Sequence, residues 1–286
     1  MTDTEALKFE IQQLTEPHGT TPPAPTEVRG AVARLFRALE EGSVRAAVPE
    51  TEGGFGAWKA VPWVKSGILL AFRVGVTRRV PGTPADFFDR DTLPLHPVDG
   101  EAHGVRIVPG GSSVRAGAHL ASGVVIMPPA YVNVGAWVGE GAMVDSHALV
   151  GSCAQIGARV HLSAGAQIGG VLEPVGLRPV VVEEEAMVGG NCGVFEGVLV
   201  GRRAVLAPGV QLSASTPVYD LVREEVYRGS RDAPLSIPEG AVVVPGSRPL
   251  ARGFGAREGL HLYAPVIVKY RDERTDSATI LEEALR

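Results

Sequence analysis

The sequence has few cysteines, no excess of positive charge and no long apolar run. Two cysteines in 286 residues cannot form a disulfide framework, so we expect a cytoplasmic protein. No stretch approaches the length of a membrane-spanning helix, and the opening residues MTDTEALKFE lack the pattern of a signal peptide. The formal net charge of −5 argues against nucleic acid or an anionic membrane as the main partner.

What the sequence does have is a six-residue repeat between Val114 and Thr216. An aliphatic residue opens each hexad, and an apolar or small residue follows it by four places. The count skips fourteen residues once, which is one repeat plus an eight-residue insertion. The opening residues are Val114, Leu120, Ile126, Val132, Val138, Val144, Val150, Ile156, Leu162, Ile168, then Val182, Val188, Val194, Val200, Leu206 and Leu212.

A six-residue period fits neither an α-helix nor an ordinary long strand, where apolar residues recur at 3.6 or 2. It predicts a mainly β fold, a parallel β-helix in which three hexads form one triangular coil. Sixteen hexads make about five coils, a prism roughly 25 Å long. A β-sandwich would need turn signals every 8–12 residues and does not explain the constant register.

The flanking segments predict two further parts. Residues 1–104 predict a small α/β domain with helices at 5–14 and 26–42, the second capped by Thr26. A strand at 43–48, a helix-to-strand segment at 58–76 and an extended connection over 77–104 complete it. The solenoid covers 105–217 with a loop insertion at 170–181. Residues 218–286 predict a β/α cap with a hairpin at 219–228, strands at 240–245 and 260–270, and a helix at 275–285, because an uncovered solenoid end exposes strand edges.

Two carboxylates stand in apolar hexads and are candidates for proton transfer. Asp145 and Ser163 are eighteen residues apart, so we expect them on the same corner of successive coils, about one strand spacing apart. Asp145 could instead accept hydrogen bonds from backbone N–H groups at its corner. Glu196 could be catalytic or could face solvent. The insertion could form a substrate wall or be only a surface turn.

Other residue types give weaker indications. Arg106 and Arg115 suit binding of a carboxylate, although either could be a solvated surface residue. His147 and His161 are fourteen residues apart and share no corner, so no zinc site is expected. Cys153 could face outward, but no base stands near it in the pattern to make it a nucleophile.

The segment AYVNVGAWVGEGAMVDSHALVGSCAQIGARVHLSAGAQIGGVLEP (130–174) closely resembles the core of the tetrahydrodipicolinate N-succinyltransferases of lysine biosynthesis. The likeness extends to RIVPGGSSVRAGAHL before it and to STPVYD, IPEGAVVVPGS and LYAPVIVKY after it. The resemblance implies a left-handed parallel β-helix and a homotrimer with active sites between subunits. It also implies transfer of succinyl from succinyl-CoA to tetrahydrodipicolinate, giving N-succinyl-2-amino-6-oxopimelate and CoA in the diaminopimelate route.

The resemblance also assigns site residues. The family's substrate-binding arginine falls on Arg106 and its active-site aspartate on Asp145, with Ser163 expected beside it in substrate binding. Several members carry a second glutamate at the position of Gly193. Either Glu196 takes over its catalytic role, or proton transfer depends on Asp145 and water.

For the co-substrate succinyl-CoA, we expect backbone groups at Gly169 and Gly170 to contact the thioester. Arg248 and Lys269, with Arg252 nearby, could bind the CoA phosphates. No metal is expected. Two alternatives stay open: an N-acetyltransferase using acetyl-CoA, because GGNCGVFEG also resembles acetyl-transferring hexapeptide enzymes, and a non-catalytic hexapeptide scaffold.

Overall fold

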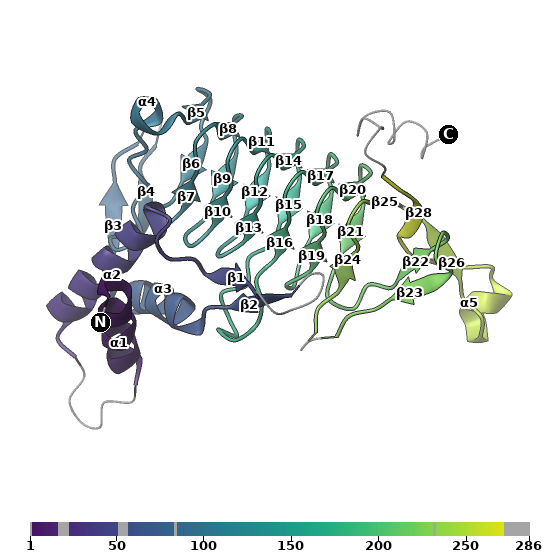
Figure 1. Ribbon diagram of the computed structural model, residues 1–286, viewed down its shortest axis with the longest axis horizontal. Coiled ribbons are helices and arrows are strands. Elements are labelled where there is room, and N and C mark those ends of the chain that lie inside the picture. Colours follow the sequence, from purple (N-terminus) through teal and green to yellow (C-terminus); the bar gives the residue numbers. More distant parts are fainter. Residues whose placement is uncertain (1, 17–22, 51–56, 83–84, 231–232, 272–286) are drawn as a thin grey trace.

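The computed structural model describes residues 2–16, 23–50, 57–82, 85–230 and 233–271. The sequence's central segment winds into a three-sided solenoid of two-residue strands, each paired in parallel with the strand one coil away (Figure 1). The expectation of a parallel β-helix is therefore confirmed. The three walls are named here sheet 1, sheet 2 and sheet 3.

Sheet 1 contains β6 (Ser113–Val114), β9 (Tyr131–Val132), β12 (Leu149–Val150), β15 (Gln167–Ile168), β18 (Gly193–Val194) and β21 (Gln211–Leu212). Sheet 2 contains β7 (His119–Leu120), β10 (Trp137–Val138), β13 (Gln155–Ile156), β16 (Val181–Val182), β19 (Leu199–Val200) and β24 (Ser236–Ile237). The coiled part of sheet 3 contains β5 (Arg106–Ile107), β8 (Val125–Ile126), β11 (Met143–Val144), β14 (His161–Leu162), β17 (Met187–Val188), β20 (Val205–Leu206) and β25 (Ala241–Val244).

The hexad pattern fills the interior of this prism. The second residue of each short strand is the hexad aliphatic, and Val144, Ile156 and Leu162 among others are fully buried. The small residues four places later are buried with them, because strand alternation sends both side chains inward. Leu172 is an exception: it lies in the inserted loop and packs against the N-terminal core instead.

Two strands beyond residue 217 belong to the coils. β24 pairs with β19 and β25 pairs with β20, both in parallel, so β24 is the sixth strand of sheet 2 and β25 the seventh of the coiled part of sheet 3. Neither strand continues the count of sixes, since the hairpin of β22 (Val218–Asp220) and β23 (Glu225–Tyr227) intervenes. The six-residue count therefore could not find them.

The C-terminal segment continues sheet 3 past the last coil. β28 (Val266–Tyr270) pairs antiparallel with β25 and parallel with β22, which covers the edge of the final strand. β26 (Ser247–Pro249), β27 (His261–Tyr263) and the short helix α5 (Gly253–Arg257) project beside it (Figure 1). The expected helix at 275–285 lies outside the described residues.

The N-terminal helices pack on one another and on the outside of the solenoid. They are α1 (Asp3–Thr15), α2 (Pro25–Glu40) and α3 (Pro62–Val74), with β1 (Ala47–Pro49) paired to β2 (Trp58–Ala60). α2 begins at Pro25 with Ala24 as its N-cap, so the expectation of a Thr26 cap is wrong: proline already has the φ of a first helical residue.

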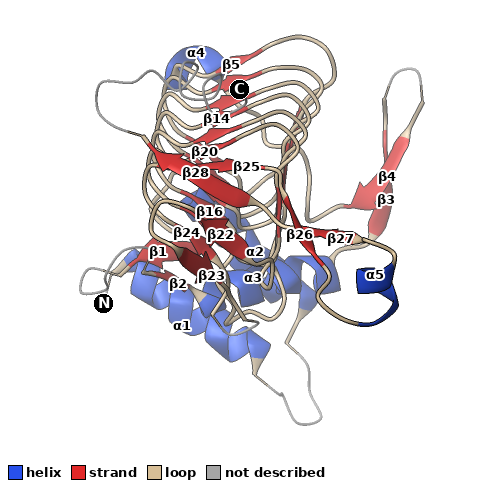
Figure 2. Ribbon diagram, turned by 90° about the vertical axis from the view of Figure 1, so that its right-hand side faces the viewer, coloured by secondary structure: helices blue, strands red, loops and turns tan. Residues whose placement is uncertain are grey.

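Where an extended connection was expected, β3 (Thr77–Val80) and β4 (Phe87–Arg90) form a hairpin that projects from the body, followed by α4 (Gly100–His103) (Figure 2). The Gly-rich turn at 53–56 lies outside the described residues.

The solenoid interior should dominate stability. We expect Leu162→Ala to lower the free energy of unfolding by roughly 2–5 kcal/mol, since it opens a cavity between two coils. Leu95→Ala is the matched control, because Leu95 is 60% exposed. Urea unfolding followed by circular dichroism measures both, and equal effects of the two substitutions would contradict a packed interior.

Candidate active site

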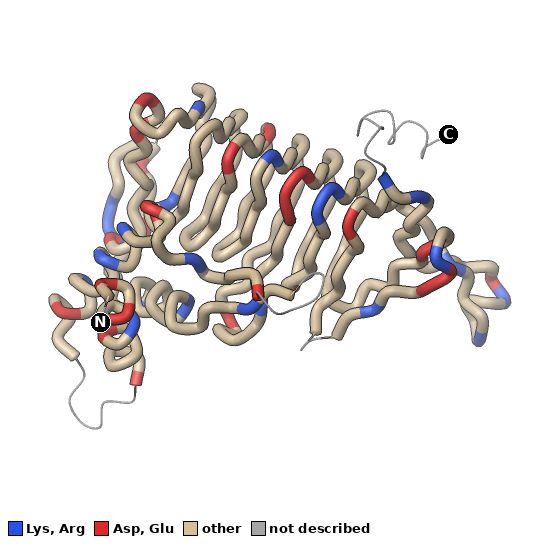
Figure 3. The backbone as a smooth tube through the Cα atoms, in the orientation of Figure 1, with Lys and Arg blue, Asp and Glu red and all other residues tan. Residues whose placement is uncertain are grey.

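Between residues 108 and 210, the three corners of the solenoid differ in the number of charged side chains that they carry. The corner between sheets 2 and 3 carries a ladder of ion pairs, including Arg159 with Glu185 at 2.7 Å and Arg202 with Glu184 at 3.0 Å (Figure 3). On the corner between sheets 3 and 1, Asp145 is the sole Asp, Glu, Lys or Arg. We call this the Asp145 corner. A charge without such a partner ladder marks it as a candidate functional position.

Asp145 lies where the spacing predicts. Its strand β11 pairs with β14, and its backbone N–H donates to Leu162 O at 2.9 Å, so Ser163 is its neighbour on the next coil. The half-buried Asp145 carboxylate accepts the Ser146 N–H on Oδ1 at 2.6 Å. Its Oδ2 accepts no hydrogen bond from the residues that the structure describes. The carboxylate thus has one oxygen fixed by the corner and one available.

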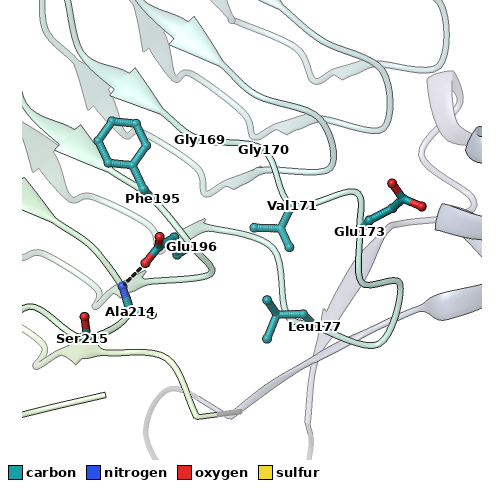
Figure 4. Close-up of a pocket in the computed structure, with 9 residues that line it drawn as sticks. All are labelled: Gly169, Gly170, Val171, Glu173, Leu177, Phe195, Glu196, Ala214 and Ser215. Carbon is teal, nitrogen blue, oxygen red and sulfur yellow. Dashed lines mark hydrogen bonds between the residues drawn. The ribbon is translucent and has the colours of Figure 1, made fainter. Parts of the chain in front are cut away.

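A cleft of about 680 Å³ opens at the corner between sheets 1 and 2, here called the Glu196 corner. One side comes from the inserted loop and the other from the next two coils (Figure 4). Its lining residues are Gly169, Gly170, Val171, Glu173, Leu177, Phe195, Glu196, Ala214 and Ser215. The structure therefore brings Gly169, Gly170 and Glu196 to one place, with the insertion as a wall.

The backbone at Glu196 differs from that of the other corners. Glu196 and Gly197 have φ of +56° and +74° in succession, whereas the other left-handed residues at the corners between 115 and 210 occur singly. The φ of Glu196 is close to that of Arg159 and Glu185 at other corners, so the second left-handed residue, Gly197, is what distinguishes this turn. One carboxylate oxygen, Oε2, accepts the Ala214 N–H at 3.1 Å (Figure 4). The exposed Oε1 has no hydrogen-bond partner within the described part of the chain.

The other expected residues lie apart from this cleft. Arg106 is exposed on β5, two strands along sheet 3 from β11, which is roughly 10 Å. Arg248 and Lys269 lie on β26 and β28 beyond the last coil, and neither lines the cleft. Arg115 forms an ion pair with Asp89 of the N-terminal hairpin, so that side chain is already engaged.

Neither a metal centre nor a membrane helix is found in the described residues. No group of three or more His, Cys, Asp or Glu side chains there could hold an ion. No described helix is long and apolar enough to cross a membrane. Cys153 faces out of the prism but is fully buried under the N-terminal helices, and burial raises its pKa to about 12, so it is no nucleophile at neutral pH.

Comparison with known proteins gives the family. Residues 6–74 match the model described as the tetrahydrodipicolinate N-succinyltransferase N-terminal domain. The chain is 42% identical to a 2,3,4,5-tetrahydropyridine-2,6-dicarboxylate N-succinyltransferase of Xylella fastidiosa (strain Temecula1 / ATCC 700964), over 91% of this chain and 89% of that protein. It is 44% identical to the enzyme of that name from Azoarcus sp. (strain BH72), over 92% and 91%. This chain belongs to the tetrahydrodipicolinate N-succinyltransferase family.

Among solved structures, the chain is similar to a hexapeptide-repeat-containing acetyltransferase from Vibrio cholerae. The two are 13% identical, over 82% of this chain and 93% of that chain, with a TM-score of 0.32.

Gly193 is the position that the resemblance assigns to a second glutamate. A Cβ at Gly193 would lie 2.1 Å from Oε1 of Gln211 and 2.4 Å from the ring of Phe195. A glutamate at this position would therefore displace both side chains. Glu196 follows β18 by two residues and lies in the lining of the cleft.

Sequence reasoning missed the residues that the N-terminal helices supply to this region. Lys65 on α3 is fully buried, and its ammonium donates to Leu177 O in the cleft wall at 2.5 Å. The signal was present: Lys65 stands beside Val64 and three residues before Ile68, on the apolar face of the helix. A lysine on such a face is an exception that marks a buried polar contact.

Burial lowers the pKa of Lys65 to about 8, while its neighbour Cys153 stays a neutral thiol. Below about pH 8 the Lys65 ammonium is charged in both the folded and the unfolded chain, so the folded state bears the full desolvation cost. Above about pH 10.5 Lys65 is neutral in both states, and that cost is absent. Stability should therefore rise through that window, by roughly 3 kcal/mol relative to Lys65→Met. Urea unfolding of both proteins at about pH 7 and pH 10.5 measures it, and a pH-independent difference would contradict the burial of a charged lysine.

Proposed function

We propose that this protein transfers the succinyl group of succinyl-CoA to tetrahydrodipicolinate in the diaminopimelate route to lysine. The observation that carries this proposal is the 42% identity to a named N-succinyltransferase over 91% of this chain and 89% of that protein. The cleft at Glu196 and the isolated Asp145 support a catalytic protein rather than a hexapeptide scaffold.

The proposed reaction is direct acyl transfer. Water adds across the cyclic C=N bond, and the ring opens to an amine and a ketone. The nitrogen lone pair then attacks the thioester carbonyl, a C–N bond forms, the C–S bond breaks, and the proton lost from nitrogen goes to the CoA thiolate. The products are N-succinyl-2-amino-6-oxopimelate and free CoA, so no acyl-enzyme is required.

In this scheme Asp145 accepts the proton of the attacking nitrogen through Oδ2, because Oδ1 is already held by the Ser146 N–H, and the proton then passes to the CoA thiolate. Ser163, one coil along, lies close enough to contact the same substrate. Arg106 binds a substrate carboxylate at the start of sheet 3, which orients the imine along the corner.

The acyl donor is proposed to enter the cleft at the Glu196 corner. Backbone groups at Gly169 and Gly170 lie in its lining and suit stabilisation of a tetrahedral oxyanion. Arg248 and Lys269 are proposed contacts of the CoA phosphates, with Glu196 as the second catalytic carboxylate. The chemistry assigned here needs no metal.

The separation of the two carboxylates supports an active site between subunits. Asp145 follows a strand of sheet 3 and Glu196 follows a strand of sheet 1, so they occupy different corners of one chain. A threefold axis facing sheet 1 would bring the Asp145 corner of one subunit to the Glu196 corner of the next. Because rotation about that axis leaves positions along the axis unchanged, the two carboxylates would stay separated by about two strand spacings, roughly 10 Å, in the direction of the axis. They would flank the substrates rather than share a proton. The homotrimer, the left-handed coiling, the division at residues 104 and 217, and the cytoplasmic location stay predictions.

A second candidate is acetyl transfer to the same amine. The charged residues lining the cleft of one chain are Glu173 and Glu196, and neither favours the free carboxylate of a succinyl group. Succinyl transfer therefore requires a cation from the neighbouring subunit or from the CoA-binding segment, whereas acetyl transfer does not.

A thiol-release assay with tetrahydrodipicolinate compares succinyl-CoA with acetyl-CoA. We expect higher kcat/KM with succinyl-CoA, and Asp145→Asn should lower kcat about 100-fold or more because it removes the proton acceptor. Glu140→Gln is the matched control, since Glu140 is exposed on the ion-pair corner and should leave turnover unchanged. A hundredfold preference for acetyl-CoA would reject the proposed donor.

The assembly is tested separately. Leu149 points outward from the middle of sheet 1, between Tyr131 and Gln167. We expect Leu149→Glu to shift the trimer toward monomer in analytical ultracentrifugation, because it places three carboxylates around the axis. Met143→Glu on the outer face of sheet 3 should leave the mass unchanged. The reverse pattern would show that sheet 1 faces away from the axis.

A further inference from the structure

The inserted loop at 170–181 is attached to the N-terminal helices at two described points. Leu172 packs against their hydrophobic core, and the carbonyl of Leu177 accepts a hydrogen bond from the buried ammonium of Lys65 at 2.5 Å. Between these points the chain supplies Glu173, and Val171 and Leu177 line the cleft from the same wall (Figure 4). The wall therefore takes its position from a helix about 110 residues earlier in the chain.

The same loop is also attached to the turn that carries Glu196. Arg178, the residue after Leu177, donates from Nε and Nη2 to Gly197 O at 3.1 and 3.0 Å. Gly197 is the second of the two left-handed residues at that turn. A continuous series of contacts thus runs from Lys65 through Leu177 and Arg178 to the backbone beside the Glu196 carboxylate.

Fixing a surface loop through a buried lysine has a cost in free energy. An ammonium loses its hydration on burial, and a carbonyl dipole compensates for that loss less well than a carboxylate does. Methionine would fill nearly the same space without that cost. A polar contact that lowers stability and ends at a cleft wall is therefore more simply explained by the geometry it imposes on the cleft than by stabilisation of the fold.

We infer that Lys65 is a positioning residue for the thioester-binding cleft, fixing the inserted loop and, through Arg178, the Glu196 turn. The inference rests on the proposed function, in which this cleft receives the acyl donor. It gives the N-terminal helices an indirect part in binding the donor, since none of their side chains lines the cleft.

The experiment compares Lys65→Met with the wild-type protein by two measurements. Hydrogen exchange of the backbone amides at 171–178 reports the loop without any need for activity. Steady-state kinetics report the cleft: removing one charged donor should raise KM for succinyl-CoA about tenfold while kcat changes less than twofold. Lys8→Met on α1 is the control, an exposed lysine of the same domain that should alter neither measurement.

Faster exchange together with the raised KM would support the inference. Unchanged exchange, or faster exchange with an unchanged KM, would overturn it, as would equal losses in Lys8→Met. If Lys65→Met does not fold, Lys65→Gln keeps a shorter donor and should show the same two changes at smaller size. If the wild-type protein uses neither succinyl-CoA nor acetyl-CoA, the proposed function fails, and the exchange measurement alone decides whether Lys65 fixes the loop.

Discussion

The backbone hydrogen bonds between successive coils are the constraint on which the rest of this structure depends. Each short strand is hydrogen-bonded to the strand one coil away. Across the insertion, Gln155 is in register with Val181 and its N–H donates to Val180 O at 2.9 Å. Because the register is fixed on all three walls, added residues can leave the prism only at a corner and must return to the same rung. This is why the insertion appears in the sequence as a single fourteen-residue step between two hexads in register. The inserted loop forms one wall of the cleft.

The same constraint decides where chemistry can be placed. Inward positions must be apolar and strands are two residues long, so corners are where polar side chains can turn outward with the least disturbance. One corner has its charges joined in a ladder, whereas the other two hold few. Asp145 and Glu196 follow strands of different sheets, so the two carboxylates of one chain lie on different corners. The proposed assembly around sheet 1 would bring these corners together across a subunit boundary.

The N-terminal helices add a different kind of support. They cover sheet 2, where Arg45 lies 3.9 Å over the Trp137 ring and bonds Gln155 at 3.0 Å, so the solenoid and the helices share an interface with aromatic and polar contacts. Lys65 extends that interface to the cleft wall. The inserted loop is thus held from both sides, by the Arg178 bonds to Gly197 O of the solenoid and by the Lys65 bond to Leu177 O.

The sequence by itself determined the coil, the inward residues, the place of the insertion and the stacking of Asp145 beside Ser163, because a period of six is a local pattern that repeats along the chain. Only the tertiary structure decided the rest. It placed Glu196 opposite Leu177, buried Cys153 beneath a helix, drew β24 and β25 into the coils and set Lys65 against a carbonyl 112 residues away. These contacts join segments with no common period, so their positions follow from the packing of the folded chain and leave no regular mark in the sequence.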